Sequence, residues 1–310
     1  GVSDVFTYTL ADGDGDTSPT TLTISLGDST PTLTLPTAGS AATTVYEAGL
    51  PARGGESAGS NAAASSETTS GTIGFSSTDG VSAVTLGGHV LTTTSQTFPV
   101  ETLANGVQGQ LTASYAYNAS TGVGTISYSF TLVDNTAGDN TSAVFAVVVK
   151  DADGDAAPAG NLSIAIVDDV PTAVNDSATQ AVENTAVTVN VFGNDVPGAD
   201  GVAITDPAKV SLVAGSLTGG TGTVVYNNDG TFTYTPAAGE DGTVTFQYQI
   251  VDGDNDPSTA TVTITLVKDS VPTIALGAGS DTSVSEAGLP GRNGGEPAGS
   301  GELAASGGAG

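Results

Sequence analysis

The sequence predicts an all-β protein built from tandem β-sandwiches in an elongated array. Thr, Val, Ser, Gly and Ala dominate the composition, whereas residues that favour helices, such as Leu, Lys and Glu, are scarce. Apolar residues recur at every second position in many short segments, which is the period of a half-buried strand. Long stretches of the 310-residue chain are also repeated. A repeat much longer than one strand indicates similar domains in series.

The alternating segments identify individual strands. They show no helical periodicity, and Asn-Asn-Asp-Gly at 227–230 is a hairpin turn signal. About seven strands per 100 residues predicts an immunoglobulin-like sandwich for each unit. The clearest segments are 145–149, 162–166, 187–191, 232–234, 244–250 and 262–266.

The repeats divide the chain into units. FTYTLADGDGDTSPTTLTISL at 6–26 returns as FQYQIVDGDNDPSTATVTITL at 246–266, and EAGLPARGGESAGS at 47–60 returns as EAGLPGRNGGEPAGS at 286–300. Each period of about 240 residues holds two units, because an acidic loop, a strand and a proline also occur at 151–171. We therefore expect a piece of a longer protein. Its parts are the last hairpin of a preceding sandwich (1–27), a longer unit (28–168), a second unit (169–268) and the start of another longer unit (269–310).

The composition narrows the possible partners. The 33 Asp and Glu residues outnumber the five Lys and Arg residues, and the net charge of −28 argues against nucleic acid and anionic membrane surfaces as partners. No apolar run approaches the length of about 18 residues that a membrane span needs. The chain has no cysteine, so its stability does not depend on disulfides.

Three loops place three aspartates within five residues. Two carboxylates about 4 Å apart repel each other by roughly 4 kcal/mol at an effective dielectric constant near 20, and a divalent cation can neutralise them. Calcium prefers hard oxygen ligands, which Asp-x-Asp spacing supplies from one tight loop. The loops are not EF-hands, because their twelfth residues are Thr23, Leu162 and Thr263 instead of Glu. The predicted calcium ligands in these loops are Asp12, Asp14, Asp16, Asp151, Asp153, Asp155, Asp252, Asp254 and Asp256.

The sandwich topology predicts that these loops lie at domain junctions. In an immunoglobulin-like order the last hairpin loop lies at the end where the chain enters the domain, so the 252–256 loop should face the linker. The further ligands expected at that junction are Glu47, Asp134 or Asp139, Asp168, Asp169, Asn194 and Asp195, with Asp200 as an additional candidate. By the same logic the 151–155 loop should meet Asp28, while Glu183, with Glu240 and Asp241, should meet Asp269. The alternative for every loop is a solvated acidic turn that only keeps the protein soluble.

Other candidate residues point to no catalytic chemistry. His89 is the single histidine in a chain without cysteine, so we expect a surface role and no zinc site. The chain has no nucleophile elbow, no Trp and few aromatic residues to hold a sugar between carboxylates, so we expect no enzyme. Arg53 and Arg292 occupy matched loops, where they either pair with Glu56 and Glu296 or only decorate the loop.

Two parts of the longer unit, YSFTLVDNTAGDN and FAVVVKDADGDAAPAGNLSIAIVDD, are similar to the type I secretion target repeat. In the second unit, VPTAVNDSATQAVENTAVTVNVFGNDVPGADG is similar to cadherin-like or VCBS-like repeats. On these motifs the chain resembles the tandem extender domains of giant repeats-in-toxin (RTX) adhesins exported by type I secretion. The resemblance implies calcium-stiffened sandwiches that form a stalk on the bacterial surface. One departure is that GGTGTV at 219–224 lacks the Asp of the glycine-rich calcium nonapeptide.

We therefore expect an extracellular structural extender on the bacterial cell surface, with calcium ions and the neighbouring repeats of its own chain as partners. One alternative is a module that binds a glycan or a protein through the Gly/Ala/Ser-rich insert near 52–70, which we expect to be a loop. Recurrence of that insert in the next longer unit favours a repeated structural role instead. A second alternative is a component of a filament or surface layer that assembles laterally.

Overall fold

The computed structural model describes residues 2–139, 141–271 and 273. The chain divides into a compact unit of residues 1–268 and a second unit of residues 269–310. The named strands all belong to the first unit, which confirms the predicted all-β class. The predicted start of another longer unit falls almost entirely outside the described residues.

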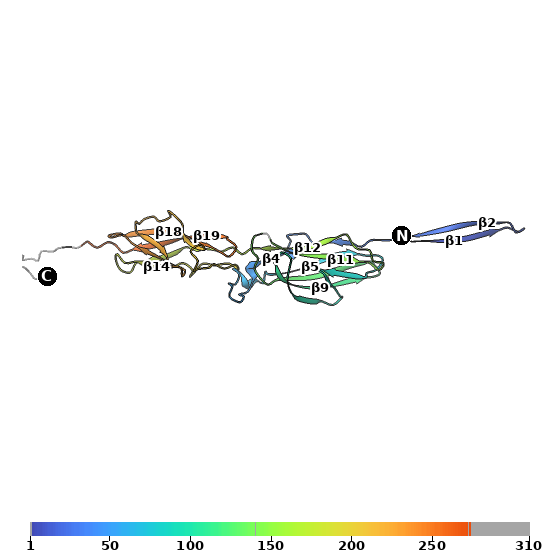
Figure 1. The fold of residues 1–310 in the computed structure, drawn as a ribbon, viewed down its shortest axis with the longest axis horizontal. Helices are drawn as coiled ribbons and strands as arrows, with labels where there is room; N and C mark the ends of the chain where they lie inside the picture. The colour runs from blue at the N-terminus through green and yellow to red at the C-terminus, as the bar shows by residue number, and fades with distance from the viewer. Residues whose placement is uncertain (1, 140, 272, 274–310) are drawn as a thin grey trace, which may run out of the picture. The chain divides into compact units, whose positions relative to one another are not determined.

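The first element is a hairpin. β1 (Val2–Ala11) and β2 (Thr17–Leu26) pair antiparallel and make a sheet of their own (Figure 1). The turn between them is the first acidic loop, and the amide of Asp12 donates to the carbonyl of Asp16 at 3.0 Å. The hairpin therefore ends at its acidic loop.

Residues 32–167 form a sandwich of two five-stranded sheets. One sheet has the order β3-β5-β10-β9-β8 and the other the order β4-β12-β11-β6-β7, with β4 parallel to β12. Alternate residues point inward, so Ile73, Ile126 and Phe130 of one sheet share a buried core with Val147 and Ile164 of the other. The strands are β3 (Thr32–Thr34), β4 (Thr44–Tyr46), β5 (Thr68–Ser76), β6 (Ala83–Leu86), β7 (His89–Val90), β8 (Gln96–Thr102), β9 (Gln108–Asn118), β10 (Val123–Leu132), β11 (Ser142–Lys150) and β12 (Gly160–Val167).

Three short 3-10 helices lie between β3 and β5: η1 (Ala41–Thr43), η2 (Glu47–Gly49) and η3 (Ala62–Ala64). The insert near 52–70 is a loop over most of its length, as expected, except that the alanine run forms η3 and β5 already begins at Thr68. Among the described residues, no helix is long and apolar enough to cross a membrane.

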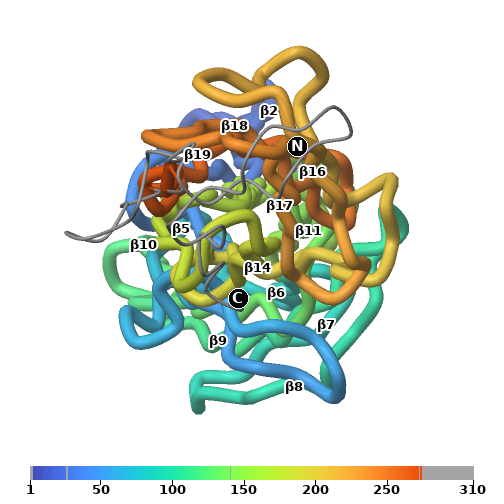
Figure 2. Tube along the Cα trace, turned by 90° about the vertical axis from the view of Figure 1, so that its left-hand side faces the viewer, coloured from blue at the N-terminus to red at the C-terminus, as the bar shows by residue number. Residues whose placement is uncertain are grey.

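Residues 176–266 form a second, smaller sandwich. A four-stranded sheet, β13-β19-β18-β15, faces a three-stranded sheet, β14-β17-β16. β18 and β19 lie side by side in both views (Figures 1 and 2), and Phe246 and Tyr248 of β18 pack against Phe232 of β17 across the core. The strands are β13 (Asp176–Thr179), β14 (Val187–Asn190), β15 (Val210–Leu212), β16 (Thr223–Tyr226), β17 (Thr231–Thr235), β18 (Gly242–Val251) and β19 (Pro257–Leu266).

Candidate metal sites at the acidic loops

The first aspartate of each acidic loop closes the loop. Its Oδ1 accepts hydrogen bonds of 2.7 to 3.1 Å from amides later in the turn: Asp12 from Gly15 and Asp16, Asp151 from Gly154 and Asp155, and Asp252 from Asp256. The fourth loop position has a positive φ in all three, held by Gly15 (98°), Gly154 (107°) and Asn255 (89°). The first aspartate is therefore part of the turn, and the aspartates at the third and fifth loop positions are the better placed candidate ligands.

Four groups of described carboxylates could each hold a metal ion, because their ligand oxygens lie within 4.8 Å of one another. Two of these groups share Asp168, the first residue after β12. The groups are Asp12, Asp14 and Asp16; Asp28, Asp153 and Asp155; Glu47, Asp168 and Asp200; and Asp139, Asp168, Asp254 and Asp256. We call the two groups that share Asp168 the junction cluster.

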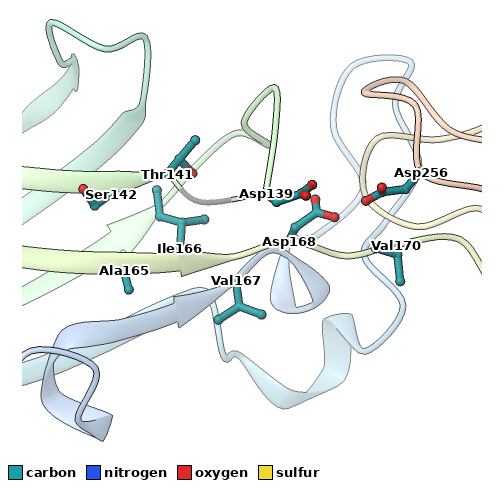
Figure 3. Close-up of a pocket in the computed structure, with 9 residues that line it drawn as sticks. All are labelled: Asp139, Thr141, Ser142, Ala165, Ile166, Val167, Asp168, Val170 and Asp256. Carbon is teal, nitrogen blue, oxygen red and sulfur yellow. The ribbon is translucent and has the colours of Figure 1, made fainter.

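The junction cluster draws its side chains from both sandwiches and from the linker between them. Glu47 belongs to η2 and Asp139 to the loop between β10 and β11, both in the first sandwich. The second sandwich supplies Asp200 and the β18–β19 loop. Figure 3 shows the carboxylates of Asp139 and Asp168 pointing toward each other, with Asp256 across from them on the other side of the same pocket.

Several oxygens of the junction cluster are buried without a hydrogen-bond partner among the described residues. They are Glu47 Oε2, both Oδ atoms of Asp168, Asp200 Oδ2 and Asp254 Oδ1. Glu47 is fully buried, and its other oxygen accepts hydrogen bonds of 2.7 Å from the amide and the hydroxyl of Thr136. Buried oxygens of this kind cost free energy unless a proton or a cation reaches them.

The electrostatics of the junction cluster favour a bound positive charge. Burial raises the pKa of Glu47 to about 8, and the charges of Asp200 and Asp168 add to the shift. Burial also raises the pKa of Asp168 to about 7, together with the neighbouring Asp256 and Asp254. Both shifts have the same cause: burial and neighbouring negative charges disfavour ionisation of these carboxyl groups.

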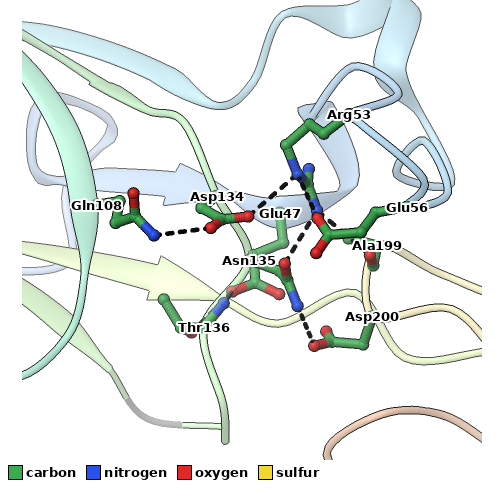
Figure 4. Close-up of polar contacts among 9 residues, drawn as sticks. All are labelled: Glu47, Arg53, Glu56, Gln108, Asp134, Asn135, Thr136, Ala199 and Asp200. Atoms are coloured by element: carbon green, nitrogen blue, oxygen red, sulfur yellow. Dashed lines mark hydrogen bonds and ion pairs between the residues drawn. The ribbon is translucent and has the colours of Figure 1, made fainter. Parts of the chain in front are cut away.

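A network of hydrogen bonds and ion pairs surrounds the junction cluster (Figure 4). The Arg53 guanidinium lies 3.2 Å from Asp134 and donates to Asn135 Oδ1 (3.0 Å) and to the Ala199 carbonyl (3.4 Å). Asn135 in turn donates to the carboxylate of Asp200. The 3.0 Å contact of Arg53 with Glu56 agrees with the pairing considered for that loop. Arg53 therefore joins the insert of the first sandwich to the second sandwich.

Three further hydrogen bonds lie at the junction. Asp169, next to Asp168 in the linker, accepts from the Ser60 amide at 2.7 Å and from the Ser60 hydroxyl. Asp254 accepts from the amide of Gly138 at 3.1 Å. Ala199 is also buried within the apolar core of the first sandwich. The insert thus contributes a structural contact at the junction.

The structure places other candidate residues away from the junction cluster. Asp134 lies against Arg53 and accepts a hydrogen bond from Gln108 (2.8 Å). Asp195 accepts hydrogen bonds from the Tyr248 hydroxyl (2.8 Å) and the Val174 amide (2.7 Å), while Asn194 donates to the Asn175 carbonyl (3.2 Å).

The candidates for the far end of the second sandwich have local contacts. Glu183 accepts from Asn184 (3.3 Å), and Glu240 accepts from the hydroxyl of Tyr234 and the amide of Ala237 (3.0 Å). Asp269 is the first residue of the second compact unit.

From the sequence, Asp200 was only an additional candidate ligand, and Asn135 and Ser60 were not predicted to lie at the junction. The available signal was the position of Asp200 in the Gly-rich GADG turn at 198–201. His89, for which we expected a surface role, stacks on Phe98 with ring centroids 4.0 Å apart and lies 3.1 Å from Glu101.

Gly198 offers a test of the junction that removes no carboxylate. Its φ is +75°, and a Cβ at this position would lie 2.2 Å from the carbonyl oxygen of Asp169. We expect Gly198→Ala to lower the free energy of unfolding by about 1–3 kcal/mol, through backbone strain and separation of the two loops. The measurement is urea denaturation, with Gly193→Ala as the control. A Cβ at Gly193 meets no atom closer than 3.7 Å. Equal effects of the two substitutions would contradict the expectation.

Comparisons with known proteins bear on the fold. Residues 168–265 match the family described as Bacterial Ig domain. No curated protein matches the chain. Among solved structures, the D00-D0 domain of intimin aligns at 16% identity with a TM-score of 0.27, covering 77% of this chain and 100% of that one.

Two protocadherin structures also align. EC1-3 of mouse clustered PcdhgC3 aligns at 12% identity and TM-score 0.26, over 86% of this chain and 77% of that one. EC1-3 of protocadherin gamma C5 gives 10% identity and TM-score 0.30, over 86% and 78%. Because these TM-scores are low, the fold assignment depends on the sheets and on the family match. Together, these two observations show that residues 168–265 form an immunoglobulin-like repeat.

Proposed function

We propose that this chain is a structural spacer segment of a bacterial surface adhesin and that calcium bound at the junction cluster stiffens it. The observation that carries the proposal is Asp168. Both of its carboxylate oxygens are buried without a hydrogen-bond partner among the described residues, and it shares oxygen clusters with both sandwiches. A linker residue in this position couples the two domains when a cation is present.

The donor set suits calcium. The six side chains of the cluster are all carboxylates, and calcium accepts hard oxygen ligands in flexible geometries, whereas zinc prefers nitrogen and sulfur. Glu47, Asp168 and Asp200 would hold one ion. Asp168 would also belong to the second group, with Asp139, Asp254 and Asp256. The ion supplies positive charge that offsets the repulsion among these groups.

The protein's own residues supply the rest of the mechanism. The Thr136 hydrogen bonds orient Glu47, and the closing hydrogen bond to Asp252 presents Asp254 and Asp256 from a fixed turn. The contact of Asp169 with Ser60 keeps the linker beside the insert. Without a cation, repulsion among the carboxylates loosens the junction, because the other contacts found there among the described residues are a few hydrogen bonds, the Arg53 network and the packing of Ala199.

An extracellular location follows from the same chemistry. Calcium sites of extracellular modules have dissociation constants of about 10⁻⁴–10⁻³ M, so they fill outside the cell and stay empty in the cytosol. The Bacterial Ig domain match supports a surface protein, and the net charge of −28 suits a soluble stalk. The role we propose is mechanical, and no catalytic step is part of it.

The exposed groups are weaker candidates for the same ion. In the Asp28 group, a hydrogen bond with Asp151, burial and the charges of Asp151 and Asp28 raise the pKa of Asp153 to about 6. Asp151 itself is buried, and its Oδ2 has no hydrogen-bond partner among the described residues. The group at Asp12, Asp14 and Asp16 is fully exposed. We therefore expect the junction cluster to fill at the lowest calcium concentration.

Small-angle X-ray scattering tests the proposal. In excess chelator we expect a broader distribution of interatomic distances, because the two sandwiches move relative to each other. Addition of millimolar calcium should narrow this distribution of interatomic distances. The control is sodium chloride added to the same ionic strength. Identical profiles in calcium and in chelator would overturn the stiffening mechanism. A calcium response without any calorimetric binding signal would also count against it.

A further inference from the structure

Residues 134–136 follow β10 and hold two carboxylates of the junction cluster (Figure 4). Thr136 donates to Glu47 Oε1 from its amide and from its hydroxyl, at 2.7 Å each. Asn135 donates from its side-chain amide to Oδ1 of Asp200. Glu47 belongs to the first sandwich and Asp200 to the second, so one short segment orients a carboxylate from each domain.

In both carboxylates the segment occupies one oxygen and leaves the other for a cation. Glu47 Oε2 and Asp200 Oδ2 are buried without a hydrogen-bond partner among the described residues, and both side chains lie in one group with Asp168. An outer hydrogen bond fixes the orientation of a metal ligand, and loss of such a partner typically lowers metal affinity about 10- to 100-fold. The segment is therefore placed to change the affinity of the site without contacting the ion.

Arg53 determines which way the Asn135 amide points. A guanidinium has only donors and a carboxylate only acceptors, so an amide between them must present its oxygen to the first and its nitrogen to the second. The hydrogen bonds follow this order, with 3.0 Å between Arg53 Nη2 and Asn135 Oδ1. The same guanidinium is held by Asp134 (3.2 Å) and by the carbonyl of Ala199 (3.4 Å), the residue before Asp200. Arg53 thus fastens the segment to the second sandwich.

We propose that residues 134–136, locked by Arg53, are a positioning segment that sets the calcium concentration at which the junction cluster fills. This inference rests on the proposed function, because it concerns how tightly the same site binds calcium. Arg53 acts by geometry, since its planar fork reaches several acceptors at once and a single ammonium group does not. Its charge alone would have the opposite effect, because a fixed cation repels a second one.

Isothermal titration calorimetry of the full chain with calcium chloride tests the segment. Arg53→Lys keeps the charge and loses the fork, so the tightest calcium dissociation constant should rise by about tenfold. Asn135→Ala should raise it by about tenfold or more, because Oδ1 of Asp200 loses its partner. Asn118→Ala is the matched control and should leave it unchanged, because Asn118 is exposed at the end of β9, opposite the first residue of β10.

Urea denaturation in chelator and in millimolar calcium gives a second measurement. Positioning predicts that Asn135→Ala reduces the increase in unfolding free energy that calcium produces, whereas a merely structural loss lowers the stability equally in both buffers. The double variant with Arg53→Lys should bind calcium about as weakly as Asn135→Ala alone, because the arginine acts on Asp200 through Asn135. Arg53→Lys leaves both of these residues in place, so it decides the question if Asn135→Ala does not fold.

The failures of this inference and of the proposed function are distinguishable. If the wild type binds calcium and both single variants bind it equally well, the positioning segment is refuted and the proposed function stands. Tighter binding by Arg53→Gln than by the wild type would show that the arginine acts as a counter-charge instead. Additive losses in the double variant would exclude the path through Asn135. Absence of calcium binding by the wild-type chain would overturn the proposed function and this inference together.

Discussion

Replacing Asp168 with asparagine should stabilise the chain in chelator and destabilise it, relative to the wild type, in millimolar calcium. Asp168 belongs to both carboxylate groups of the junction cluster. In chelator the substitution removes one negative charge from a repelling group at nearly constant volume. We expect a gain of about 1 kcal/mol in the free energy of unfolding there. In calcium it removes a ligand that both sites share.

The expected loss in calcium can be bounded. An ion with a dissociation constant of about 10⁻⁴ M stabilises the folded state by about 1.4 kcal/mol at about 1 mM free calcium. Two ions would double that contribution, and Asp168→Asn should remove most of it. Urea denaturation of both proteins in both buffers gives the four free energies required.

Asp4→Asn is the charge-matched control, because Asp4 is an exposed residue of the β1–β2 hairpin. It should change the stability equally in the two buffers. The idea fails if Asp168→Asn behaves in the same way, since the aspartate would then be an ordinary solvated residue of the linker.

In chelator the stability of the chain should fall as the pH rises from about 5 to about 8. Glu47 carries this dependence, because burial, reinforced by Asp200 and Asp168, raises its pKa from 4.5 to about 8. Below pH 4.5 the carboxyl group is protonated in both the folded and the unfolded state, so its contribution to the free energy of unfolding is fully present. As the pH rises through the folded pKa, the folded state loses its proton and with it that stability.

Calcium should reverse this trend. Metal ligands must be deprotonated, so the apparent calcium affinity increases over the same pH range and the stability no longer falls. Thermal unfolding at pH 5, 6, 7 and 8, with and without calcium, measures both curves. Glu47→Gln should flatten the curve in chelator. A wild-type curve that rises with pH in chelator would show that the buried carboxylate is not under the expected strain.

Much of the candidate site follows from local sequence. Alternation of apolar residues predicted the strands of both hairpins, and the Asp-x-Asp spacing with glycine predicted the tight acidic loops between them. The sequence also supplied Glu47, Asp168 and the 252–256 loop as candidates for one junction. These features depend on contacts within a few residues, or on pairing between neighbouring strands.

Only the tertiary structure decided which carboxylates lie close together. Arg53 approaches Asp134 from an insert about eighty residues away and pairs with it, and the Tyr248 hydroxyl holds Asp195 inside the second sandwich. Asp200 instead reaches the junction cluster, because Ala199 packs into the core of the first sandwich and draws the neighbouring turn with it. Such choices depend on how two domains dock, which no local pattern encodes. By itself, the chain's sequence determined an all-β class with acidic turns, and the packing between sandwiches determined which of those turns face one another.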